Sequence, residues 1–104
     1  MGDARWTELR GKEVRHRDRR WELTGDVEVQ ESGAVLALRA RNVDDVRHEE
    51  ATLYFDRRTD EDTLNPGDLG EHFDSIERRG QSSFLVVKKD GRTYRYKLRR
   101  LEHA

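Results

Sequence analysis

Two arginine-rich stretches are the residues best suited to bind a ligand. The first runs from Arg15 to Arg20, directly before Trp21, and the second covers residues 92–100, where cations occupy alternate positions. Guanidinium and ammonium groups pair with phosphate and carboxylate oxygens. The candidate residues for a surface that binds nucleic acid or a protein partner are therefore Arg15, Arg17, Arg19, Arg20, Arg95, Lys97 and Arg99.

Alternation along the second stretch separates its cations from its aromatic residues. If residues 92–100 form a strand, Arg95 and Lys97 face one side while Tyr94 and Tyr96 face the other. Proteins that bind single-stranded nucleic acid usually present aromatic groups and cations on one surface. The pattern favours a solvated outer face over a phosphate-binding stripe. A nucleic-acid surface requires the two basic stretches to lie side by side.

Other chemistry-bearing patterns are incomplete. Asp60, Glu61 and Asp62 begin like a calcium loop, but Leu64 and Asn65 stand where an oxygen ligand and a glycine are required. The four histidines lack the helical spacing of a zinc site, and the chain has no cysteine, nucleophile elbow or phosphate-binding loop. We therefore expect no metal, no cofactor and no enzymatic activity. A small-ligand or enzyme site around His72 and His48 remains the least favoured alternative.

Period-two alternation of apolar residues predicts most of the chain to be β-strand. Asp90-Gly91 between two such runs is typical of a type I′ hairpin turn, and Gly25 is expected to mark a bulge. Trp6 and Leu9 are expected to dock the N-terminal segment on the sheet. The predicted strands cover residues 12–15, 20–24 continuing through the bulge to 30, 34–40, 50–55, 83–89 and 92–101.

One amphipathic helix is predicted between the strands, after a charged loop over residues 56–67. Asn65 is suited to cap it, Pro66 to begin it and Gly80 to follow its end. An apolar stripe with helical spacing lies between these signals and consists of Leu69, His72, Phe73 and Ile76.

These elements define the expected fold class. The chain is mainly β (α+β), with an antiparallel sheet or small open barrel of five to six strands and one amphipathic helix before a C-terminal hairpin. A length of 104 residues fits a single domain, 1–104. No apolar run approaches the roughly 18 residues of a membrane span, and the N-terminus lacks an apolar signal core. A soluble, cytoplasmic protein without membrane contact is expected.

The net charge of −1 conceals a separation of charge. Residues 24–77 carry a net charge of −10, whereas residues 78–104 carry +7. Such segregation favours a binding or adaptor module that meets another macromolecule. We expect a protein partner or self-association, with non-specific nucleic-acid binding through a basic patch as the alternative. The two charges could also pair within one molecule.

Overall fold

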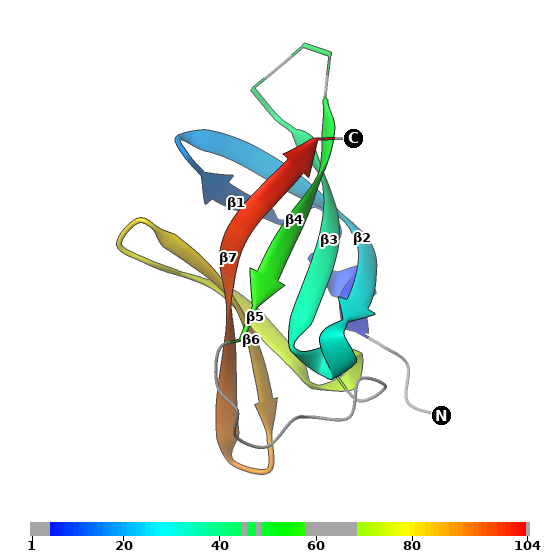
Figure 1. The fold of residues 1–104 in the computed structure, drawn as a ribbon, viewed down its shortest axis with the longest axis vertical. Coiled ribbons are helices and arrows are strands. Elements are labelled where there is room, and N and C mark those ends of the chain that lie inside the picture. Colours follow the sequence, from blue (N-terminus) through cyan, green and yellow to red (C-terminus); the bar gives the residue numbers. More distant parts are fainter. Residues whose placement is uncertain (1–4, 45, 48, 58–68, 104) are drawn as a thin grey trace.

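A computed structural model describes residues 5–44, 46–47, 49–57 and 69–103, which form one antiparallel sheet rolled into a nearly closed barrel (Figure 1). The strand order is β1-β2-β3-β4-β7-β6-β5. The strands are β1 (Glu13–His16), β2 (Arg19–Gln30), β3 (Val35–Asn42), β4 (Glu50–Asp56), β5 (Phe73–Arg79), β6 (Ser82–Lys89) and β7 (Arg92–His103). Within the described ranges there are three short 3-10 turns: η1 (Arg5–Leu9) before β1, η2 (Glu31–Gly33) between β2 and β3, and η4 (Gly70–His72) before β5. The described residues contain no helical segment that could span a lipid bilayer.

The predicted antiparallel strands are confirmed where alternation and turn residues agree. Asp90 and Gly91 have φ values of 51° and 77°, as the type I′ turn between β6 and β7 requires. The register between β2 and β3 shifts between Leu23 and Val27, and Gly25 lies there with a φ of 94°. The bulge expected at this glycine is therefore present, and it bends the long strand β2.

The expected number of strands and the expected helix are wrong. The sheet has seven strands rather than five to six, and residues 73–79 form β5 instead of the second half of a helix. Opposite β6, Phe73 pairs with Val87 and Ser75 with Val86, so Asp74 is an extra residue in the strand. Such a bulge places Phe73 and Ile76 on the same face at helical spacing. Only the single turn of η4 precedes it, and the predicted cap residues Asn65 and Pro66 lie outside the described residues.

Gly80 illustrates the same ambiguity at the end of the segment. A glycine after a helix and a glycine in a hairpin both adopt positive φ. Gly80 has a φ of 59° and turns β5 into β6. The expected charged loop falls largely on residues 58–68, outside the described ranges, as do Asp60, Glu61 and Asp62.

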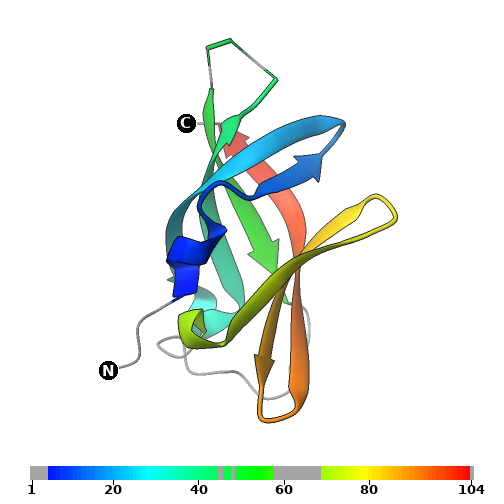
Figure 2. The same cartoon turned by 180° about the vertical axis from the view of Figure 1, so that it is seen from behind.

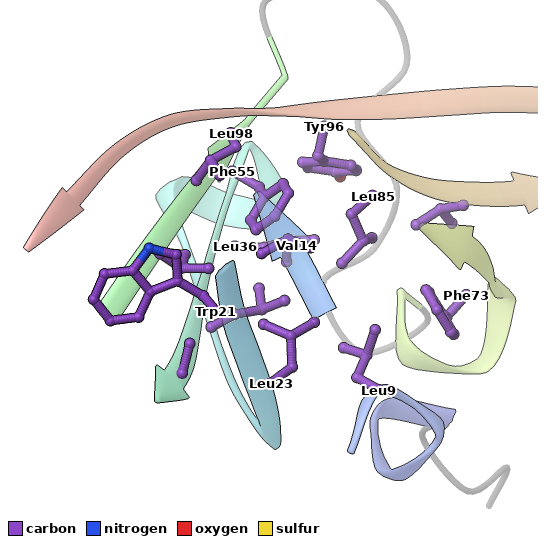
Figure 3. Packing of buried hydrophobic residues seen from close by; sticks show 14 of the residues in the cluster. Leu9, Val14, Trp21, Leu23, Leu36, Phe55, Phe73, Leu85, Tyr96 and Leu98 are labelled. Carbon is purple, nitrogen blue, oxygen red and sulfur yellow. The ribbon is translucent and has the colours of Figure 1, made fainter. Parts of the chain in front are cut away.

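The core fills the interior of the barrel (Figure 3). Trp21 and Leu23 of β2 are each 1% exposed, so both belong to the core. Leu9 of η1 is fully buried, and the Trp6 ring lies 6.1 Å from that of Phe73. The expected docking of the N-terminal segment is thus present, at the end of the barrel where η1 meets η4.

The barrel remains open between its two edge strands, β1 and β5 (Figure 2). Strand β1 approaches β6 across this opening, and the Ser83 hydroxyl donates a hydrogen bond to the Arg15 carbonyl at 3.1 Å. The two hairpins β1–β2 and β5–β6 therefore project on the same side of the molecule, next to the C-terminal half of β7 (Figure 1).

Candidate anion-binding cleft

A cationic cleft of about 450 Å³ lies between the β1–β2 hairpin and the C-terminal half of β7. It unites parts of the two basic stretches, which are far apart in the sequence. No carboxylate is among its described lining residues, which are His16, Arg17, Arg19, Trp21, Arg99, Arg100, Leu101 and His103. We refer to this feature as the cationic cleft.

The β1–β2 hairpin supplies one wall of the cationic cleft. Arg17 and Asp18 have φ values of 50° and 65°, and His16 pairs with Arg19 directly beside this two-residue turn. The turn is therefore of type I′, which matches the twist of the flanking strands. It holds Arg17 and Arg19 at the tip of the hairpin, where both side chains face solvent.

A bulge in β7 supplies the opposite wall. Phe55 of β4 pairs with Leu98 and Tyr54 pairs with Arg100, which leaves Arg99 as the extra residue. The bulge interrupts strict alternation, so Arg99 and Arg100 are both exposed although they are neighbours in the sequence. Two successive guanidinium groups can therefore face the tip of the β1–β2 hairpin.

Trp21 lies at the base of the cleft. Its ring is 6.1 Å from that of His103 in an edge-on arrangement, and its indole nitrogen is buried without a hydrogen-bond partner among the described residues. Figure 3 shows the nitrogen on the edge of the ring that faces β7. At 1% exposure the ring is too deep to stack on a base, so the cleft offers charge but no aromatic platform.

The arginines of the two walls differ in whether another side chain of the protein already lies against their charge. On β7, Arg99 lies 3.7 Å from an Asp56 carboxylate oxygen, and the Arg100 guanidinium lies 4.0 Å from the centre of the Tyr54 ring. Within the described part of the chain, no acidic group forms an ion pair with Arg17 or Arg19. The hairpin tip therefore carries the charge that is most available to an anion.

Two histidines line the cationic cleft, His16 and His103. Partial burial, and then the nearby Arg17 charge, lower the pKa of His16 below its usual value. His103 Nδ1 lies 3.1 Å from a Glu49 carboxylate oxygen, which is outside the set of lining residues. An anion bound between the walls would favour protonation of His16, because it would offset the repulsion from Arg17.

The structure divides the predicted binding residues among three places. Arg17, Arg19 and Arg99 meet in the cationic cleft, whereas Arg15 and Arg20 line a separate groove between β1 and β5. Arg95 lies 3.6 Å from Glu77, farther along β7, and Lys97 of the same strand is half-buried. The predicted residues therefore do not form one continuous surface.

Sequence reasoning missed the remaining lining residues of the cleft: His16, Trp21, Arg100, Leu101 and His103. One available signal was the spacing of apolar residues in β7. Tyr94, Tyr96 and Leu98 follow at intervals of two, but the next apolar residue, Leu101, follows at three. That change of interval indicates a bulge and would have placed Arg100 on the exposed side.

Other sites gain no support from the described residues. No group of three histidine, cysteine, aspartate or glutamate side chains is arranged to hold a metal there. His72 lies in η4 and does not line the cationic cleft, and His48 is outside the described residues. Val46 is the one large apolar side chain exposed in the described ranges.

Part of the separated charge pairs within the molecule. Acidic residues from the middle of the chain lie beside cations of the C-terminal strands in the pairs Asp56–Arg99, Glu77–Arg95 and Asp74–Lys88. All are partly exposed, so each stabilises the fold only weakly. They nevertheless reduce the charge available for association between copies.

The chain was compared with protein-family models, curated proteins and solved structures, and no match was found in any of the three comparisons.

Proposed function

We propose that this protein is a binding module without enzymatic activity that holds phosphate groups of a nucleic-acid backbone in the cationic cleft. The observation that carries the proposal is the juxtaposition of Arg17 and Arg19 with Arg99 and Arg100, in a cleft whose described lining contains no carboxylate. Arginine groups on two walls suit the repeated, negatively charged oxygens of a backbone. Because contacts to the backbone carry no sequence information, the proposed binding does not read base sequence.

Two observations favour this function over self-association through charge. The acidic middle and the basic C-terminal strands already pair within one molecule, as in Glu77–Arg95. In addition, Val46 is the one large hydrophobic side chain exposed among the described residues, which leaves little apolar area for a stable interface between copies.

The test is a fluorescence-anisotropy titration of a labelled single-stranded oligonucleotide at several salt concentrations. Four phosphate contacts predict a slope of log K against log salt of about −2.8. Between roughly 50 mM and 200 mM salt, the affinity should then fall about 50-fold. Removing two contacts in the double variant Arg17→Gln/Arg19→Gln should reduce the slope to about −1.4.

The matched control is Lys89→Gln/Arg92→Gln, which removes the same charge at the far end of β7. Arg92 is separated from Arg99 by roughly 23 Å of extended strand, and Figure 1 shows the β6–β7 turn at the opposite end of the long axis from the C-terminal end of β7. This control should keep the original slope. Absence of binding at low salt, or equal slopes for the two double variants, would refute the proposal.

A further inference from the structure

The opening between the two edge strands of the barrel is a second candidate site. It forms a groove of about 530 Å³ that is lined by residues of β1 and β5, and Figure 2 shows these two edge strands. We call it the edge groove. Its described lining residues are Lys12, Glu13, Val14, Arg15, Arg20, Ser75, Ile76, Arg78 and Ser83.

Strand β1 directs backbone groups that do not bond to β2 toward the edge groove. The Lys12 carbonyl accepts a hydrogen bond from the Leu23 N–H at 2.8 Å, and bonded pairs alternate along an antiparallel ladder. The peptide groups of Val14 therefore bond to β2, whereas those of Glu13 and Arg15 point away from it. The hydrogen bond from the Ser83 hydroxyl to the Arg15 carbonyl shows that this carbonyl faces the opening.

Strand β5 presents the same arrangement from the other side. Arg79 pairs with Ser82 across the two-residue turn that begins at Gly80. Residues that flank such a turn form a hydrogen-bonded pair, and the bonded pairs then alternate along the strand. The N–H and C=O groups of Ile76 and Arg78 therefore point away from β6, toward the edge groove.

The direction of the strands determines what fits between these edges. All six pairings in the order β1-β2-β3-β4-β7-β6-β5 are antiparallel, so β1 and β5 run in the same sense. One further strand between them, running in the opposite sense, would be antiparallel to both. It would complete an eight-stranded barrel and pair with backbone groups of both edges, with the Arg15 carbonyl exchanging its hydrogen bond from the Ser83 hydroxyl for one from the added strand.

The charge of the groove indicates the chemistry of that strand. Within the described ranges, Lys12, Arg15 and Arg78 take part in no ion pair, whereas Glu13 lies 3.9 Å from Arg20. The unpaired charge is thus positive. We propose that the edge groove binds an extended, acidic segment of a partner protein as an additional strand, with alternate apolar side chains toward Val14 and Ile76.

A fluorescently labelled octapeptide of alternating valine and glutamate, blocked at both ends, is the probe. We expect saturable binding in an anisotropy titration of the full chain. A second peptide has the same side chains but carries N-methyl groups on alternate peptide nitrogens, which removes the donors on one edge of the strand. It should bind at least tenfold more weakly, because several backbone hydrogen bonds are lost together.

Two substitutions at Arg15 separate backbone pairing from charge. Arg15→Gln removes only the charge, whereas Arg15→Pro also removes the N–H that points into the groove. Proline is tolerated on an edge strand at such a position. The proline variant should bind the valine–glutamate peptide about fivefold more weakly than the glutamine variant. Arg17→Gln/Arg19→Gln should bind this peptide like the unaltered protein, which distinguishes the edge groove from the cationic cleft.

Backbone amide exchange provides a readout on the unaltered protein. The N–H groups of Glu13, Arg15, Ile76 and Arg78 should exchange rapidly in the free protein and become protected on binding of the peptide. Equal binding of the methylated and unmethylated peptides, or protection confined to other strands, would overturn the proposal. So would a protein that dimerises by itself and loses that dimer in Arg15→Pro, since the occupant of the groove would then be a second copy.

Discussion

Removal of the Tyr96 hydroxyl would test the closure of the barrel, because this group links two residues that are far apart in the sequence. It donates a hydrogen bond of 2.6 Å to the Gly33 carbonyl, in the turn between β2 and β3. Tyr96 is 0% exposed, so the substitution Tyr96→Phe leaves a buried carbonyl without its partner. The expected loss in the free energy of unfolding is about 2 kcal/mol.

Urea denaturation followed by circular dichroism measures this loss. With a denaturant slope of about 2 kcal/mol per M, the midpoint should fall by about 1 M. The control is Tyr54→Phe, which deletes a hydroxyl that donates to Glu102 at 2.8 Å on the outer face of the barrel. The midpoint of this variant should stay unchanged, because water replaces the lost bond. Equal midpoints for the two phenylalanine variants would refute the placement of Tyr96.

The pH dependence offers a second measurement of the same contact. Burial raises the pKa of Tyr96 above its usual value near 10. The unfolded chain therefore releases this proton first, so the stability that Tyr96 contributes is complete below about pH 10 and is lost as the pH rises further. Tyr96→Phe should lack this part of the alkaline loss. An unchanged alkaline loss would show that the hydroxyl is not buried.

Two further predictions concern the cationic cleft and the bend in β2. The lowered pKa of His16 disfavours its charged form in the folded state, so His16 should reduce stability as the pH falls from about 6.5. The urea midpoints at about pH 7.5 and 5.5 should therefore differ less in His16→Gln than in the unaltered protein. An equal difference in the two proteins would contradict this prediction. Gly25→Ala should lower the free energy of unfolding by about 1 kcal/mol through backbone strain, since Gly25 has a φ of 94° and its added Cβ would lie no closer than 3.5 Å to Arg10. Gly25→Asn should lose less in the same denaturation assay, because asparagine tolerates positive φ; equal losses would argue against a conformational cause.

The strands could be predicted where two local signals agree. Alternation in β7 and the Asp90-Gly91 pair require the same hairpin, and the structure contains it. The segment around Phe73 and Ile76 could not be assigned from spacing alone. An interval of three between apolar residues fits both one turn of a helix and a strand that contains an extra residue. Which of the two structures forms depends on the long-range pairing of β5 with β6.

The candidate site was predictable residue by residue but not as a surface. Arg17, Arg19 and Arg99 were identified as ligand-binding types from the sequence, and all three line the cationic cleft. Their meeting depends on the order of the sheet, in which β2 and β7 are separated by β3 and β4, and on the curvature that brings these strands together again. Local patterns indicate the bulges that bend β2 and β7, but they do not encode the strand order.

The distribution of charge also explains why the strongest basic segment is not the best anion site. Residues 78–104 carry a net charge of +7, but Lys88, Arg95 and Arg99 lie beside carboxylates of the acidic middle. The β1–β2 hairpin belongs to residues 1–23, whose net charge is only +2, yet Arg17 and Arg19 at its tip form no ion pair with any described residue. Affinity for an anion should therefore depend more on this tip than on the cations of β7 that already have acidic neighbours.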